Sequence, residues 1–392
     1  MIYTYPHYYK KFNCIADKCP DTCCGKWQIV IDDDSLEKYE NYDGEYSGEL
    51  RRRVNWNEGV FRHGRNGKCA FLRDDLLCDM YIHMGKDSLC NTCREYPRHT
   101  EEFENVREVS LSLSCPEAAR IILNTTDIVT FVSDEDDEDE VFDDFDYFLY
   151  SNLEDIREEI LRILQDRSVD IRSRIERVLQ IGASAQRHYD EGNLVMWDEL
   201  EEQDKPQISR KCGQQEGYEE NMLLQKQAMF LLEDLELLYD DWDDVFIESQ
   251  ELLFGDGEMA FAKNRKQFEK WWDDNCQIPD GEHRQDDGRS ANSASDGGGL
   301  RISLDIFIEQ ITVYFISIYL LGAVYDDNIV GKVDACMGHA VELYMLAMAR
   351  WIKNGETLSM DDLIELAYRY SREIEHSDEN LEQVEILDWF GR

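Results

Sequence analysis

The sequence predicts a mainly α-helical protein that begins with a cysteine-rich, metal-binding region containing short strands. Nine of the twelve cysteines lie within residues 1–115, and apolar residues follow a helical spacing from Leu149 onward. The 392 residues, 42% of them hydrophobic, suffice for two domains. We therefore expect a cysteine-rich region at 1–133, an acidic linker at 134–148 and an α-helical domain at 149–392.

Short strands are expected in the first region. Residues 27–31 (WQIVI) and 109–113 (VSLSL) are rich in β-forming residues, and the second segment alternates apolar and polar side chains like a half-buried strand. Residues 134–146 are mostly acidic. Like charges at this density oppose a compact helix, so an exposed loop is expected there.

The helical domain opens with one apolar stripe, formed by Leu153, Ile156, Ile160, Ile163 and Leu164. The periodicity continues at 171–179 and at 222–254. Residues 277–300 are rich in glycine, serine and aspartate, and predict a flexible loop.

Three more helices are expected toward the C-terminal end. Residues 301–352 form two strongly apolar segments that are separated near 326–328. Ser359, with Asp362 three residues later, has the spacing of a capping box and predicts the start of a further helix.

The charge is extreme and unevenly distributed. The formal net charge is −44; residues 1–130 hold 17 basic against 22 acidic residues, and the remainder holds 24 against 63. Such a field repels nucleic-acid phosphates and anionic membranes, and attracts a basic polypeptide. A solvated acidic surface that only maintains solubility is the alternative. Nucleic acids and membranes are therefore not expected as partners.

The apolar segments predict a cytoplasmic protein. The first twelve residues lack the apolar core of a secretory signal. The most apolar stretch, Ile311 to Tyr325, is 15 residues long and is flanked by acidic residues. A bilayer span needs about 20 residues, so this stretch predicts a buried helix.

The clustered cysteines indicate a metal site. Lasting disulfides are rare in a reducing cytoplasm, whereas converging thiolates suit a soft metal. An iron–sulfur cluster takes four thiolates and structural zinc takes four cysteines or histidines, so spacing alone leaves both open. Cys115 precedes a proline, as in some iron–sulfur motifs. The thiols could instead be buried apolar groups, but nine in 115 residues favour a metal.

Eight of these cysteines are the candidate ligands: Cys14, Cys19, Cys23, Cys24, Cys69, Cys78, Cys93 and Cys115. His63, His83 and His99 lie in the same region and could complete a zinc site, although a role near the ligands or at the surface is more common. The three cysteines farther along the chain, Cys212, Cys276 and Cys336, have no neighbouring cysteine and are expected to be structural or incidental.

These motifs resemble a known family. The order is Cys14-x4-Cys19-x3-Cys23-Cys24, then residues 69–72 (CAFL), 77–78 (LC), 92–98 (TCREYPR) and 114–120 (SCPEAAR). Over residues 1–123 this series is similar to the flagellin lysine-N-methylase family, and more distantly to small cysteine-cluster proteins that chelate zinc or iron. Cys90 departs from the family pattern and ranks below the other eight cysteines as a ligand.

The resemblance implies transfer of a methyl group from S-adenosylmethionine to flagellin lysines in the cytoplasm before export. It also implies a bound iron–sulfur cluster, most simply 4Fe–4S. Arg94, Tyr96 and Arg98 are the candidate cofactor-binding residues, because arginines can hold a carboxylate such as that of the methionine moiety. Alternatively the arginines could offset thiolate charge or pair with Glu95 and neighbouring acids, and this structural role is the favoured one.

The sequence does not single out a catalytic residue. A lysine ε-amine must lose its proton before it can be methylated, and many acidic and aromatic residues could assist. No Gly-rich turn of the nucleotide-binding type lies between a strand and a helix. Two other hypotheses therefore stand beside the enzyme: a non-enzymatic metal- or cluster-binding protein with a partner-binding helical domain, and a zinc-stapled interaction module.

Overall fold

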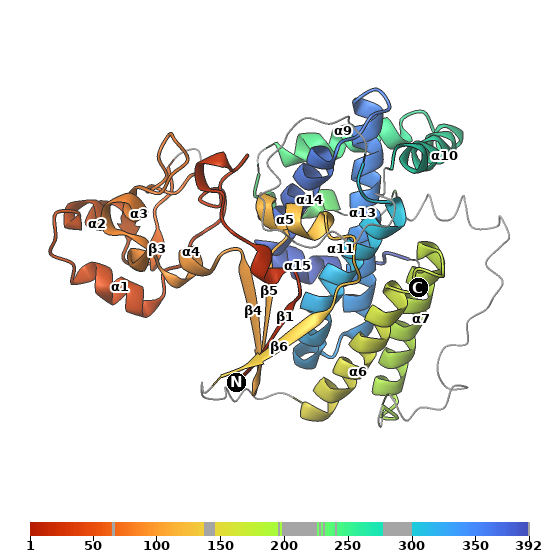
Figure 1. Ribbon diagram of the computed structural model, residues 1–392, viewed down its shortest axis with the longest axis horizontal. Coiled ribbons are helices and arrows are strands. Elements are labelled where there is room, and N and C mark those ends of the chain that lie inside the picture. Colours follow the sequence, from red (N-terminus) through yellow and green to blue (C-terminus); the bar gives the residue numbers. More distant parts are fainter. Residues whose placement is uncertain are drawn as a thin grey trace, which may run out of the picture.

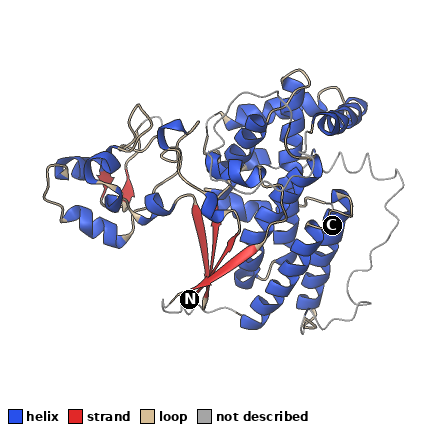
Figure 2. Ribbon diagram, viewed as in Figure 1, coloured by secondary structure: helices blue, strands red, loops and turns tan. Residues whose placement is uncertain are grey.

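The computed structural model contains a four-stranded sheet, a small cysteine-rich lobe and a larger helical domain (Figures 1 and 2). It describes residues 1–64, 67–136, 146–194, 197, 226, 229, 232–239, 241–276 and 300–390. Residues 277–299 of the loop predicted at 277–300, the apolar positions 222–224 and 231, and Cys212 lie outside these residues.

The sheet has the strand order β4-β5-β1-β6. Its strands are β1 (Ile2–Pro6), β4 (Arg98–Phe103), β5 (Val106–Leu111) and β6 (Phe131–Glu135). β4 and β5 form an antiparallel hairpin, while β1 pairs parallel to β5 and antiparallel to β6. Of the strand predicted at 109–113, residues 109–111 are confirmed as the end of β5, whereas Ser112 and Leu113 lie beyond it. The exposed loop predicted from residue 134 is wrong at its start, because Asp134 and Glu135 pair with β1.

The cysteine-rich lobe has its own small core. Four short helices surround it: α1 (Asp33–Glu40), α2 (Ser47–Arg53), α3 (Asp79–Met84) and α4 (Asn91–Glu95), with the hairpin β2 (Val54–Asn55) and β3 (Val60–Phe61). In Figure 1 the lobe projects to one side of the remaining structure. Its core contains Leu50, Phe61, Phe71, Cys69 and Cys90.

The strand predicted at 27–31 is wrong. Ile29 and Ile31 are buried and Val30 is exposed, so the alternation is real. However, β3 is only two residues long, and Val30 makes a single isolated bridge to Val60. Asp32 then caps α1, which ends the extended segment.

The predicted helical region from residue 149 onward is confirmed, and one earlier helix, at 116–123 within the predicted cysteine-rich region, packs against it to complete the helical domain. It comprises α5 (Pro116–Leu123), α6 (Tyr147–Leu164), α7 (Ile171–Asp190), α9 (Trp242–Phe254), α10 (Glu258–Asn275), α11 (Leu304–Tyr319), α12 (Ala323–Asp326), α13 (Ile329–Lys353), α14 (Met360–Glu375) and α15 (Asp378–Glu385). The predicted stripe of α6 is buried. Most of α13 is buried as well, because α7, α9, α11 and α14 pack around it.

Helix boundaries follow local chemistry. Asp327 has a positive φ of 60° and ends α12, which separates the two apolar helices as predicted. The capping box of Ser359 and Asp362 is present at the start of α14. The helical periodicity predicted over 222–254 is interrupted among the described residues, because 232–234 form a 3-10 turn and α9 begins at Trp242.

One apolar segment is long enough to cross a membrane. Residues 304–326, from α11 through α12, meet that criterion by length and composition, and 72% of the most apolar window is buried inside the protein. Glu309 of α11 is fully buried and paired with Arg174 of α7 and with Arg167. These ion pairs and the burial identify α11 as a core helix of this domain, as the sequence predicted.

Candidate functional site

The nine N-terminal cysteines are all free thiols. Short turns rather than long helices position them: Cys78 and Cys90 immediately precede α3 and α4, and Cys115 precedes α5. The backbone N–H of Cys69 donates to the carbonyl of Cys24 at 2.8 Å, which joins two distant cysteine motifs.

Electrostatic interactions run between these thiols. Burial, with smaller contributions from the thiols of Cys78, Cys90 and Cys23, raises the pKa of Cys69 to about 11. Burial likewise raises the pKa of Cys115 to about 12, with Cys19 and Cys23 adding to the effect. Cys23 therefore lies close enough to interact with cysteines from several separate motifs.

The donor chemistry suits a soft metal, because buried thiolates need a cation to neutralise their charge. The positions of the side chains support a metal site less clearly than their chemistry does. Among the residues that the structure describes, no three Cys, His, Asp or Glu side chains converge as metal ligands. We therefore assign no coordination geometry. Cys14 is exposed, whereas Cys90, ranked last from sequence, is fully buried and accepts a hydrogen bond from Cys93 that lowers its pKa.

The three histidines of this region have different surroundings. The His83 ring stacks on Tyr46 at 5.0 Å and faces Asp79. His63 lies opposite Cys69 through an isolated bridge. His99 belongs to the four-stranded sheet, where its Nε2 lies 2.8 Å from Glu101.

The predicted cofactor-binding residues point to different surroundings. The Arg94 guanidinium contacts Glu95 and Asn91 at the surface of the lobe. Arg98 lies over the rings of Tyr9 and Phe12. The Tyr96 hydroxyl forms a hydrogen bond of 3.0 Å with Ser114. These three side chains are therefore not brought together.

Sequence reasoning missed a polar face of α14. Tyr368, Arg372, Glu375 and His376 recur at helical spacing, and Arg372 and Glu373 are nearly fully buried. The available signal was a set of charged residues within the apolar stripe of a predicted helix, because ions are rarely buried unless they are paired.

Arg372 joins the cysteine loops to the helical domain. Its Nε donates to the carbonyl of Ser114 at 2.8 Å, and Nη1 bonds the carboxylate of Asp21 and the hydroxyl of Tyr239. Asp21 lies between Cys19 and Cys23, and Ser114 precedes Cys115. One guanidinium thus ties two cysteine motifs to α14.

An aromatic group lies beside Arg372. The ring of Trp27 is 4.8 Å from His376 and 5.9 Å from Tyr96. The Nε2 atom of His376 is 3.1 Å from the Ser114 hydroxyl. Burial, together with Arg372, lowers the pKa of His376 to about 3, so its imidazole is neutral at pH 7. Aromatic faces of this kind can hold a sulfonium cation.

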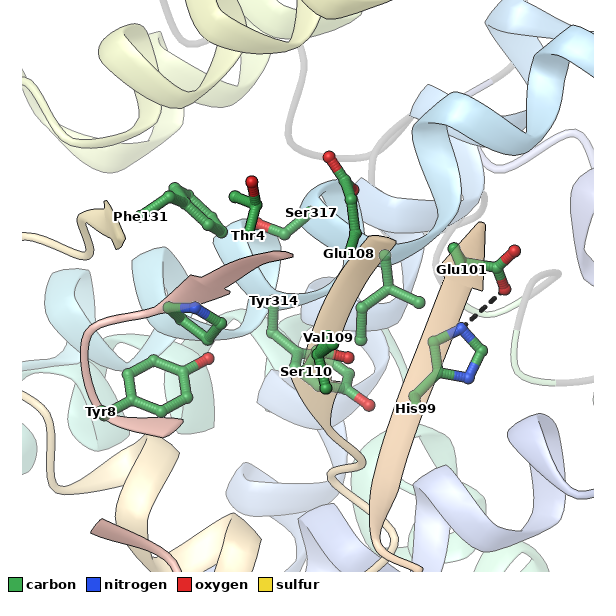
Figure 3. Close-up of a pocket in the computed structure, with 12 residues that line it drawn as sticks. Thr4, Tyr8, His99, Glu101, Glu108, Val109, Ser110, Phe131, Tyr314 and Ser317 are labelled. Carbon is green, nitrogen blue, oxygen red and sulfur yellow. Dashed lines mark ion pairs between the residues drawn. The ribbon is translucent and has the colours of Figure 1, made fainter. Parts of the chain in front are cut away.

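A small pocket lies between the sheet and α11 (Figure 3). It has a volume of about 20 Å³, enough for one water molecule or the end of a side chain. Register places residues of all four strands on the same sheet face, and these line the pocket: Thr4, Pro6, His99, Glu101, Glu108, Ser110 and Phe131. Tyr8 and, from α11, Tyr314, Ser317 and Ile318 complete the wall.

The pocket is polar and partly desolvated. Burial alone would lower the pKa of His99, but the carboxylates of Glu101 and Glu375 raise it overall. The buried Ser110 hydroxyl has no hydrogen-bond partner in the described part of the chain. Glu108 is already paired with Arg157. A cationic or amine ligand would therefore meet Glu101 and His99.

The pocket and the α14 face are connected. Tyr314 donates to the buried carboxylate of Glu375 at 2.7 Å and accepts the backbone N–H of Leu113 at 2.9 Å. The hydroxyls of Ser112 and Ser114 lie 2.6 Å apart. The loop before Cys115 therefore links the thiols, the aromatic group and the pocket, and together these form the candidate functional site.

These features define a mainly helical protein in which a thiol-rich lobe is anchored to a buried polar helix face. Residues 299–387, a range that includes α11 to α15, match the FliB lysine N-methylase C-terminal domain. The chain belongs to the flagellin lysine N-methylase family, as its cysteine motifs predicted.

Curated relatives support this assignment. Over 133 residues, or 32% of this chain, it is 30% identical to the flagellar biosynthetic protein FliU of Salmonella muenchen and covers 78% of that protein. The same identity relates it to the lysine-N-methylase of Salmonella typhimurium, of which 33% is covered. The chain thus matches about a third of the length of that enzyme. No solved structure matches.

Proposed function

We propose that the protein is a lysine N-methyltransferase that acts on flagellin in the cytoplasm with S-adenosylmethionine as methyl donor. Membership of the lysine N-methylase family is the observation that carries this proposal. The pocket under α11 supports it, because it offers a desolvated, acidic and aromatic environment that an ε-amine could enter.

The pocket residues can account for the chemistry required of the protein. An exposed lysine has a pKa of about 10.4, so burial and a base must favour its neutral form. In the transfer, the amine lone pair forms a C–N bond as the methyl–sulfur bond breaks, leaving the electron pair on sulfur. The amine proton passes to the His99–Glu101 pair, which we assign as the base.

We further propose that the N-terminal cysteines hold an iron–sulfur cluster, with zinc as the alternative. The free thiols and their mutual electrostatic effects support this. A bound metal would neutralise the thiolates and brace the lobe against α14. Trp27, Tyr96 and His376 are the residues that we expect to face the sulfonium of the methyl donor.

The test is to co-express this protein with flagellin and to measure the intact mass of flagellin. We expect mass increases of one methylene unit per methyl, located on lysines by peptide mapping. Unmodified flagellin in the presence of soluble, metal-loaded protein would favour a non-enzymatic metal-binding protein instead.

Replacing Glu101 by glutamine should slow methylation by roughly a hundredfold at pH 7, because general-base assistance is worth about that much or more. The rate should recover partly at higher pH, where more of the lysine is already neutral. The control is Glu102→Gln, the next residue on β4, which does not line the pocket. An unchanged rate and pH profile in the Glu101 variant would remove this pair from the mechanism.

Replacing Cys23 by serine should remove most of the bound metal, because Cys23 interacts with cysteines of several motifs. Metal content per protein and visible absorbance measure this; a brown protein indicates iron–sulfur and a colourless zinc protein the alternative. The matched control is Cys336→Ala, a buried cysteine of α13. Equal metal content in both variants would contradict the proposed site.

A further inference from the structure

The outer edge of β6 is open for strand pairing in the described part of the chain. β6 ends the strand order, and all five of its residues are exposed. Its hydrogen bonds to β1 include His7 N–H to Thr130 and Asp136 N–H to Met1. Because such bonds alternate along an antiparallel pair, the backbone groups of Phe131, Ser133 and Glu135 point away from β1.

The chemistry of this edge selects a basic partner. Glu135 makes no hydrogen bond or ion pair with its side chain among the described residues, and Phe131 and Val132 are each 39% exposed. A second copy of this chain would bring the same acidic strand and the same net charge of −44, and the two copies would repel each other. A segment with lysine side chains would instead meet opposite charge, in a protein of net charge −44.

The edge is also adjacent to the pocket. Phe131 lines the pocket together with Thr4 and Pro6 of the neighbouring strand β1, as Figure 3 shows for Phe131 and Thr4. Ser133 and Glu135 share the sheet face of Phe131, because side chains alternate along a strand. Every second side chain of a segment paired with β6 would lie on that face.

We propose that the outer edge of β6 binds an extended, lysine-bearing segment of the protein substrate by strand addition. This inference rests on the proposed function, since it names how that substrate docks. Main-chain hydrogen bonds from Phe131, Ser133 and Glu135 hold the segment, and the Glu135 carboxylate selects for lysine, since Asp134 is already paired with Lys10.

The probe is a fluorescent peptide of alternating lysine and threonine, long enough for one strand, and its affinity is measured by anisotropy without methyl donor. Ser133→Pro removes an outward N–H without removing a main-chain bond to β1, so affinity should fall about tenfold; the hydroxyl contact to Thr4 at 3.2 Å is lost equally in the alanine control. Ser133→Ala keeps that N–H and should bind within about twofold of wild type. Glu135→Lys should weaken binding about fivefold, whereas Glu251→Lys on α9 should have no effect.

Hydrogen exchange provides a second measurement that needs no variant. Bound peptide should slow exchange of the Phe131, Ser133 and Glu135 amides. Wild-type affinity in the Ser133→Pro variant, unchanged exchange at these amides, or equal binding of an alternating glutamate–threonine peptide would each overturn the inference. The binding measurement contains no methyl donor, so it is independent of methylation. Peptide binding without flagellin methylation would refute only the proposed function. Methylation without peptide binding would refute only strand addition.

Discussion

Replacing Arg372 by alanine should lower the free energy of unfolding by on the order of 3 kcal/mol, because the change leaves buried partners of a charged group unpaired. The guanidinium is 1% exposed and bonds the Ser114 carbonyl and the Asp21 carboxylate. Its loss should also release the loops that carry Cys19, Cys23 and Cys115. Urea denaturation and limited proteolysis measure the two effects.

Arg369→Ala is the matched control on the same helix. Arg369 pairs with Asp241 and Glu365, which are 69% and 39% exposed, so its removal should cost less than about 1 kcal/mol. We expect faster cleavage near residues 14–24 only in the Arg372 variant. Equal stability and equal cleavage in the two variants would show that Arg372 does not anchor the lobe.

Replacing Glu342 by glutamine should change how stability depends on pH. Glu342 of α13 is 1% exposed, its Oε1 has no partner in the described part of the chain, and burial raises its pKa from 4.5 to about 8. The folded state therefore keeps this proton where the unfolded state has lost it. The contribution of the protonated Glu342 carboxyl to stability is fully present below pH 4.5 and is lost as the pH rises through 8. The free energy of unfolding falls by at most about 5 kcal/mol over this range.

Glutamine stays uncharged across this pH range, so the variant should be more stable than wild type at pH 9. At pH 5 the two proteins should differ little in stability. Urea titrations of both proteins across this range measure the difference. Glu251→Gln, an exposed position of α9, should leave the pH dependence unchanged. Parallel stability curves for wild type and the Glu342 variant would show that Glu342 is ionised in the folded protein.

Sequence periodicity was sufficient to predict the helices of the helical domain. The stripe from Leu153 to Leu164, the break near Asp327 and the capping box at Ser359 depend on local spacing and local hydrogen bonds. The segment 27–31 shows the limit of such reasoning. Its alternation was genuine, but strand formation also required a long enough partner, and that depends on tertiary structure.

The candidate site was only partly visible in the sequence. The cysteines and the family resemblance marked the thiol-rich lobe, yet the α14 residues that anchor it lie more than 250 positions from Ser114. The pocket combines side chains from four strands whose pairing order, β4-β5-β1-β6, is not that of the chain. Arg372 has no local pattern that predicts its partners, whereas His99 and Glu101 lie two residues apart on one strand.

The most direct measurement combines anaerobically purified, metal-loaded protein with S-adenosylmethionine and unmodified flagellin. S-adenosylhomocysteine and methylated lysine are then quantified in the same samples. We expect the two products in equal amounts, with both strongly reduced in the Glu101→Gln variant. Neither product forming in the wild-type sample, while its metal content stays intact, would contradict the assignment as a flagellin lysine methyltransferase.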